Sequence, residues 1–181
     1  MKSFLVIGLL LLASCGKDII IQRVEIPAPI LDSRLQCQVF DLTGIAGVPV
    51  FKDLQALGIL PVSRIDSISN GTTSPFKPFE NTEYAYLVEN FAINCDGIFE
   101  AKESGTYIFA INSDDGSTLT LGDTKLIDNN TDHGMIKKSI SVLLMKGSYK
   151  FNTTYYNHSG SKGFVLSYKR PNASLEEVLK F

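Results

Sequence analysis

Two neighbouring carboxylates stand in the middle of residues 109–122, FAINSDDGSTLTLG, where alternating residues lead into and out of Asp114-Asp115-Gly116. A tight turn usually needs one Asp or Asn and one Gly, so turn formation alone does not explain the second carboxylate. Adjacent like charges repel unless they point into water or a cation neutralises them. The stretch therefore indicates either a polar turn, in which Gly116 adopts a positive φ, or a site for a hard cation.

A calcium site needs more oxygen ligands than these two side chains. Calcium is bound by carboxylates and by amide and backbone carbonyl oxygens. The loop at residues 155–163, YYNHSGSKG, offers Asn157 as a neutral third ligand beside Asp114 and Asp115. These residues meet only if the strands before and after the two loops end at the same end of the fold.

Enzyme motifs are missing from the sequence. It contains no H-E-x-x-H, no phosphate-binding G-x-x-x-x-G-K-[ST] and no G-x-S-x-G. His133 and the stretch HSGSKG at residues 158–163 are typical of loops. The sequence does not exclude a pair of carboxylates for glycoside hydrolysis, because such a pair is defined by its distance in space and not by its spacing in the sequence. The absence of Trp argues against a deep sugar-stacking cleft, and we expect a protein that is not an enzyme.

Strand patterns dominate the elements that would position these residues. Apolar side chains recur at every second position, with turn residues every eight to twelve positions, which is typical of an antiparallel sandwich or barrel. Examples of this alternation are Tyr107, Phe109, Ile111, Leu119, Leu121, Tyr149, Phe151, Tyr155, Phe164, Leu166 and Tyr168. The fold class predicted is all-β, an antiparallel β-sandwich over residues 35–171. Ser174 and Glu177 have the spacing of a capping box, so residues 172–181 are expected to form a tail or a short helix.

The first residues are typical of a targeting signal. Lys2 precedes an apolar run, and small residues follow the run. The apolar run is too short for a membrane-spanning helix. Residues 12–15, LASC, resemble a bacterial lipobox, and that resemblance implies a signal peptide at residues 1–14 and a lipid on Cys15. An ordinary signal peptide is the alternative. With no Asp directly after Cys15, the resemblance favours the outer membrane, and residues 16–34 are interpreted as a tether.

The other two cysteines have no such role. In an oxidising compartment Cys37 and Cys95 most simply pair as a disulfide, the alternative being two buried thiols. The formal charge of −2 and the lack of a basic patch argue against nucleic acid as a partner.

The order of motifs in the second half resembles the PA-14 domain, a β-sandwich family named from protective antigen. The resemblance covers about residues 96–171. It runs from GTYIF through the Asp-Asp-Gly turn and residues 126–128, LID, to SVLLMKGSY, YYN and the closing strand before Pro171. The Trp of the family's W-x-G motif is missing, since residues 94–97 read NCDG.

In lectin-like members of this family the two Asp are joined by a cis peptide and bind one calcium ion, which holds vicinal sugar hydroxyls. The resemblance implies that Asp114, Asp115 and Asn157 are the metal ligands. The nearest side chains for sugar contact are His158, Ser159 and Lys162.

The sequence thus predicts a lipid-anchored protein of the cell envelope that binds a glycan or glycoconjugate with Ca²⁺. The alternative is a structural or protein-interaction sandwich in which the Asp-Asp-Gly turn binds no sugar. The sequence indicates no particular protein partner.

Overall fold

The computed structural model describes residues 36–49, 59–60 and 85–179. The predicted signal segment 1–14, Cys15 and the tether 16–34 lie outside these residues. Within the described part of the chain, no helix is long and apolar enough to cross a membrane.

All regular elements of the described residues are β-strands. Short turns separate most of them, in agreement with the period-two pattern of the sequence. They are β1 (Gln36–Asp41), β2 (Ile59–Leu60), β3 (Phe91–Ala101), β4 (Gly105–Asp114), β5 (Ser117–Leu121), β6 (Thr124–Asn129), β7 (Ile136–Leu144), β8 (Gly147–Asn157), β9 (Gly163–Lys169) and β10 (Glu177–Val178).

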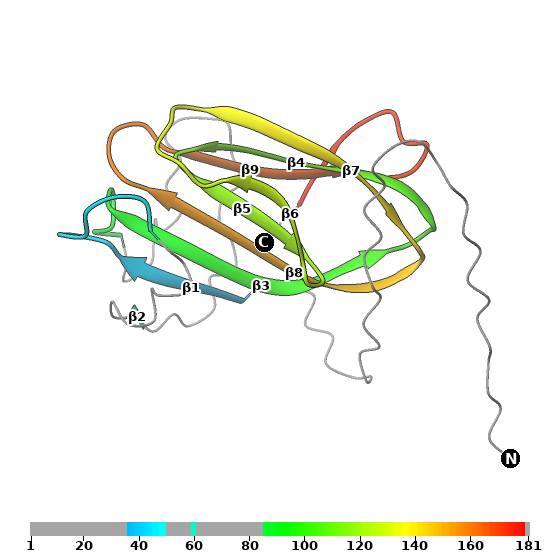
Figure 1. The fold of residues 1–181 in the computed structure, drawn as a ribbon, viewed down its shortest axis with the longest axis horizontal. Coiled ribbons are helices and arrows are strands. Elements are labelled where there is room, and N and C mark those ends of the chain that lie inside the picture. Colours follow the sequence, from blue (N-terminus) through cyan, green and yellow to red (C-terminus); the bar gives the residue numbers. More distant parts are fainter. Residues whose placement is uncertain (1–35, 50–58, 61–84, 180–181) are drawn as a thin grey trace, which may run out of the picture.

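The strands form two antiparallel sheets that face each other. One has the order β2-β1-β3-β8-β5-β6 and the other the order β10-β9-β4-β7. Figure 1 shows β9, β4 and β7 in one layer and β1, β3 and β8 in the other. The predicted fold class, an antiparallel β-sandwich, is confirmed.

Aromatic side chains fill the space between the sheets. Phe99 from β3 lies edge-on against Phe109 of β4 and Tyr168 of β9, with ring centroids 5.0 and 5.2 Å apart. Tyr107 and Ile111 point to the same side of β4 as Phe109, and all three are at most 1% exposed. Burial of such large apolar surfaces is the main favourable term in folding.

Strands β4 and β8 begin at the same end of the sandwich, and each opens with a G-x-Y pattern. Two similar turns explain this pattern. The Tyr107 hydroxyl donates to the carbonyl of Glu103 and accepts from its N–H, and Tyr149 does the same with Met145. Gly105 precedes Tyr107 with φ +149°, and a Cβ there would lie 2.7 Å from Pro171. The glycine is therefore required by backbone conformation and by packing.

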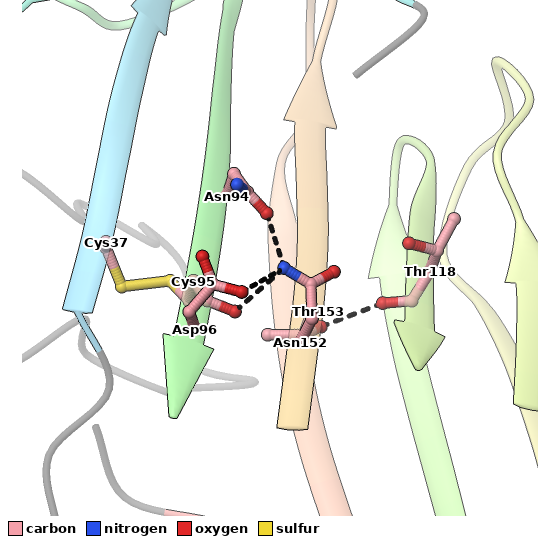
Figure 2. The surroundings of a disulfide bond; sticks show 7 residues. All are labelled: Cys37, Asn94, Cys95, Asp96, Thr118, Asn152 and Thr153. Carbon is pink, nitrogen blue, oxygen red and sulfur yellow. Dashed lines mark hydrogen bonds between the residues drawn. A yellow bond between two sulfur atoms is a disulfide. The ribbon is translucent and has the colours of Figure 1, made fainter. Parts of the chain in front are cut away.

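The predicted disulfide between Cys37 and Cys95 is present and joins β1 to β3 at directly opposite positions. Figure 2 shows that Asn152, on the next strand β8, donates to the side chains of Asn94 and Asp96, at 2.7 and 2.9 Å. The disulfide, whose two cysteines belong to the core, and these hydrogen bonds thus hold β1, β3 and β8 together.

For residues 172–181 the sequence left a tail or a short helix open, and the described residues 172–179 form no helix. Glu177 and Val178 form β10, which pairs with Tyr168 and Ser167 of β9. The Glu177 carboxylate, placed by the sequence in a capping box, accepts from the Tyr168 hydroxyl at 2.9 Å. Pairing with the open edge of β9 prevailed over the local helix signal, as tertiary contacts often do for short segments.

Candidate functional site

The Asp114-Asp115-Gly116 turn connects the two sheets. It follows β4, which pairs with β7 and β9, and precedes β5, which pairs with β6 and β8. It is therefore a crossover at one end of the sandwich and not a hairpin between paired strands. The peptide bond between Asp114 and Asp115 is cis, the conformation that the family resemblance implies.

Gly116 is needed for space. Its φ is not positive, contrary to the expectation for a simple polar turn. A Cβ at this position would lie 2.2 Å from the Tyr156 ring, so the aromatic side chain packs directly on the backbone of the turn. The neighbouring Tyr155, which points to the other side of β8, donates from its hydroxyl to the Asp114 carbonyl at 2.8 Å.

Asp115 is buried, with 7% of its surface exposed, and both oxygens of its carboxylate accept hydrogen bonds. Oδ1 accepts from the His133 N–H at 3.1 Å and Oδ2 from the His158 N–H at 2.8 Å. Two separate loops thus fix the orientation of one acidic side chain.

Asp114 is partly exposed, and its surroundings disfavour a negative charge. Burial raises the pKa of the Asp114 carboxyl above its ordinary value of 3.8, repulsion from Asp115 raises it further, and His133 opposes both effects. A cation bound between the two carboxylates would remove this repulsion.

Asn157 is completely buried and only half satisfied. Its Nδ2 donates to the Ser161 carbonyl at 3.0 Å, which fixes the orientation of the amide. Its Oδ1 is buried and has no hydrogen-bond donor among the described residues. A buried unpaired acceptor costs about 1–3 kcal/mol, so this oxygen needs a partner that the described residues do not supply.

The structure brings the predicted site residues to one end of the sandwich. Gly163, at the end of the loop that follows Asn157, lies opposite Asp114 in the register of β9 with β4. The N–H of His158, the residue directly after Asn157, binds Asp115. The condition that the sequence left open, a shared end for the two loops, is therefore met.

The three residues proposed for sugar contact differ in their freedom. Ser159 is exposed and His158 is partly exposed. Lys162 donates from Nζ to the Val88 carbonyl at 2.9 Å. The same loop is held by hydrogen bonds from the Gly160 N–H to Glu89 and from the Asn90 N–H to the His158 carbonyl. Lys162 thus helps to brace the loop.

Sequence patterns missed the segment between β6 and β7. Asp132 accepts a hydrogen bond from the Tyr156 hydroxyl at 2.8 Å and lies 3.5 Å from His158 Nδ1. His133, interpreted from the sequence as a plain loop residue, contributes its N–H to Asp115. No local signal could identify these contacts, because they join segments that are distant in the sequence.

The donor set of the site consists of oxygen atoms. Among the described residues, no group of three His, Cys, Asp or Glu side chains is placed to hold a metal ion. Two carboxylates and the unpaired amide oxygen of Asn157 suit a hard cation that accepts carbonyl and water oxygens as further ligands.

Comparisons with known proteins agree with this architecture. The family model of the PA14 domain matches residues 66–180. A comparison with curated protein sequences gives no match.

Several solved structures share the fold at low sequence identity. The PA14 domain of the MpAFP antifreeze protein has a TM-score of 0.60 and 15% identity, covering 87% of this chain and 93% of that one. A PA14 sugar-binding domain from an RTX adhesin has a TM-score of 0.59 and 15% identity, covering 81% and 94%. The Epithelial Adhesin 9 A domain from Candida glabrata, in complex with Galβ1-4GlcNAc, has a TM-score of 0.52 and 16% identity, covering 79% and 84%.

Other matches are to parts of longer chains. This chain spans 32% and 49% of two structures described as anti-sigma factor domain-containing proteins. The family model covers more than half of the chain, and the strand order and inter-sheet turn described above lie largely within the match. The chain belongs to the PA14 domain family.

Proposed function

We propose that this PA14 domain is a calcium-dependent carbohydrate-binding or adhesive module. Asp114 and Asp115 would hold the ion as charged ligands and Asn157 as a neutral ligand. The observation that carries the proposal is the buried Asn157 Oδ1, which has no donor among the described residues and lies in the residue next to a backbone N–H that binds Asp115.

The residues present fit calcium. Asp115 is held in one orientation by two N–H groups, and Asp114 is close enough to Asp115 for the repulsion to raise its pKa. When bound, the ion would neutralise both carboxylates and offer coordination positions to vicinal hydroxyls of a sugar. Such hydroxyls are oxygen ligands of the kind that calcium accepts.

The surroundings of the site suit a polar ligand at a shallow surface. The exposed hydroxyl of Ser159 and the partly exposed ring of His158 offer hydrogen-bonding groups beside Asn157. The sugar-binding RTX adhesin domain and the adhesin bound to Galβ1-4GlcNAc have the same fold, which supports a glycan as the ligand class.

A structural role for calcium is the second candidate. It is favoured by the bracing of the loop after Asn157, in which Lys162 is bound to Val88 and Gly160 to Glu89. In that case the ion would stiffen this end of the sandwich, and the domain would bind a protein or no partner of its own.

The sequence LASC at residues 12–15 resembles a lipobox and indicates the cellular setting. We propose that Cys15 carries a lipid and that the domain is held at the cell envelope, in the outer membrane, where it binds a ligand and does not catalyse a reaction.

Binding of the purified protein to a glycan array, with calcium and with chelator, tests the proposed function. The wild type should bind a set of glycans only with calcium, and the Asp114→Asn/Asp115→Asn variant should bind none. Asp123→Asn, which removes one charge from the exposed turn between β5 and β6, should bind as the wild type does. Glycan binding that persists in chelator would exclude a calcium-bridged mechanism.

A further inference from the structure

Residues 130–135, which connect β6 to β7, lie against the candidate site. His133 donates from its N–H to Asp115 Oδ1 at 3.1 Å, and this is one of the two hydrogen bonds that orient the carboxylate. The other comes from His158, in the loop after Asn157. The position of residues 130–135 therefore affects the geometry of a candidate calcium ligand.

Tyr156 is the anchor of this segment. Its ring is 1% exposed and packs on Gly116, so the hydroxyl has little freedom to move. That hydroxyl donates to Asp132 Oδ1 at 2.8 Å, one residue before His133. The other carboxylate oxygen of Asp132 lies 3.5 Å from His158 Nδ1, which brings the segment beside the second loop of the site.

The start of the segment is also fixed. Asn129 is 2% exposed and donates from Nδ2 to Ser113 Oγ at 3.2 Å. Ser113 and Ser117, on either side of the double-aspartate turn, share a hydrogen bond of 2.7 Å between their hydroxyls. Asn129 thus fixes the start of the segment, and the His133 ring lies 3.1 Å from the Asn129 carbonyl. The Tyr156–Asp132 bond is the side-chain contact that ties the segment to β8, one residue before His133.

Groups that hydrogen-bond a ligating carboxylate set its orientation, and changing them typically weakens metal binding 10–100-fold. We propose that Tyr156 and Asp132 are positioning residues of the calcium site, whose hydrogen bond holds residues 130–135 against Asp115. This inference rests on the proposed function, because it assigns the outer hydrogen bonds of the same site.

Single-atom deletions on β8 test the proposal. Tyr156→Phe removes the hydroxyl that binds Asp132 and keeps the ring on Gly116. Tyr149→Phe is the matched control, because it removes a buried tyrosine hydroxyl that donates to Met145 at the other end of the same strand. In calorimetric titrations with calcium chloride, Tyr156→Phe should bind about tenfold more weakly than wild type, and Tyr149→Phe should bind equally well.

Asp132 variants separate positioning from charge. Asp132→Asn keeps an oxygen that accepts from the Tyr156 hydroxyl, so its calcium affinity should stay within about threefold of wild type. Asp132→Ala removes the acceptor and should weaken binding as Tyr156→Phe does. If Asp132→Asn is as weak as Asp132→Ala, the carboxylate acts through its charge and the positioning role is wrong.

Hydrogen exchange of the His133 amide in calcium-free protein gives a second readout. The exchange should be faster in Tyr156→Phe than in wild type and unchanged in Tyr149→Phe. Equal rates in all three proteins, or equal calcium affinities of the two tyrosine variants, would overturn the proposal. A wild type that binds no calcium would overturn the proposed function and with it the role in metal binding, while the exchange rates still decide whether Tyr156 holds the segment.

Discussion

Gly116 illustrates how a residue in a turn can be required by packing at a distance. Glycine after two aspartates suggests a backbone with positive φ, but the structure shows a tyrosine ring against the position where a Cβ would be. Tyr156 is 40 residues later in the sequence, on a strand that the turn residue meets only after folding. The identity of Gly116 was thus readable from the sequence, but its physical reason was not.

Gly116→Ala should destabilise the domain because its Cβ would lie 2.2 Å from the Tyr156 ring. Overpacking of a well-filled site typically costs about 1–3 kcal/mol. Urea unfolding should show this loss in the free energy of unfolding.

Gly134→Ala is the matched control, since a Cβ at Gly134 has no neighbour within 4 Å and the backbone there does not need glycine. Its unfolding midpoint should equal that of wild type. Equal stability of the Gly116 and Gly134 variants would contradict the account of the turn.

Strand β8 is the element that organises the site. It lies between β3 and β5, and its last residues face both sides of the sheet. Tyr155 points into the core and binds the Asp114 carbonyl, while Tyr156 covers Gly116 from the other side. Asn157, directly after them, carries the unpaired oxygen, so one strand end supplies a candidate ligand and two supports of the turn.

The alternating strands could be predicted from sequence, and β3 shows why the rest could not. Phe91, Ala92 and Ile93 are consecutive and all at most 2% exposed, because Ala92 packs on the outer side with Phe40 and Tyr156 while its neighbours face the core. A strand covered on both sides has no period-two pattern. Likewise, the pairing of β10 with β9 could not be predicted, because the free edge of β9 exists only in the assembled sheet.

The docking of β10 should depend on Glu176. Its carboxylate accepts from Lys137 at 2.9 Å and from the Ser167 hydroxyl at 3.0 Å. The hydrogen bond with Lys137 is the main reason that the pKa of Glu176 is lowered below 4.5. A lowered pKa means that the contribution to stability is present above 4.5 and is lost as the pH falls through the folded-state value.

Glu176→Gln should therefore lower the protection of the Leu179 amide, which donates to the Leu166 carbonyl, at pH 6. The global free energy of unfolding should change by less than about 1 kcal/mol, since the ion pair is largely exposed. Protection factors from hydrogen exchange should differ between variant and wild type at pH 6 and converge as the acid is protonated. A difference that is independent of pH would exclude the carboxylate as the cause.

The disulfide acts at the scale of the whole molecule. Cys37 and Cys95 are 58 residues apart, and the bond ties β1 to the central strand β3. Closing a loop of this length stabilises the folded state by about 4 kcal/mol in the chain-entropy model.

Cys37→Ala/Cys95→Ala should lose about 4 kcal/mol of unfolding free energy, measured with urea, and wild type in reductant should lose a similar amount. The variant in reductant is the control and should not change further. A double variant as stable as the oxidised wild type would show that the bond does not constrain the unfolded chain.

The fold, the double-aspartate turn and the loop after Asn157 could each be predicted from the sequence. That the turn and the loop lie next to each other could not. Period-two alternation and turn spacing are local, so the sequence predicts a sandwich. The family resemblance pointed to Asp114, Asp115 and Asn157, whereas the support from His133, Asp132 and Tyr156 depends on the placement of three separate segments. Ion binding would therefore depend on the relative positions of all three segments.

The most direct test is calorimetry of calcium into chelator-stripped wild type, Asn157→Ala and Asp123→Asn. One site is expected in wild type and in Asp123→Asn, which changes an acid in a different turn. No site is expected in Asn157→Ala, which lacks the unpaired oxygen. Calcium binding should also raise the melting temperature of wild type. Absence of heat and of any calcium-dependent shift in wild type, or equal affinity in Asn157→Ala, would contradict the calcium site.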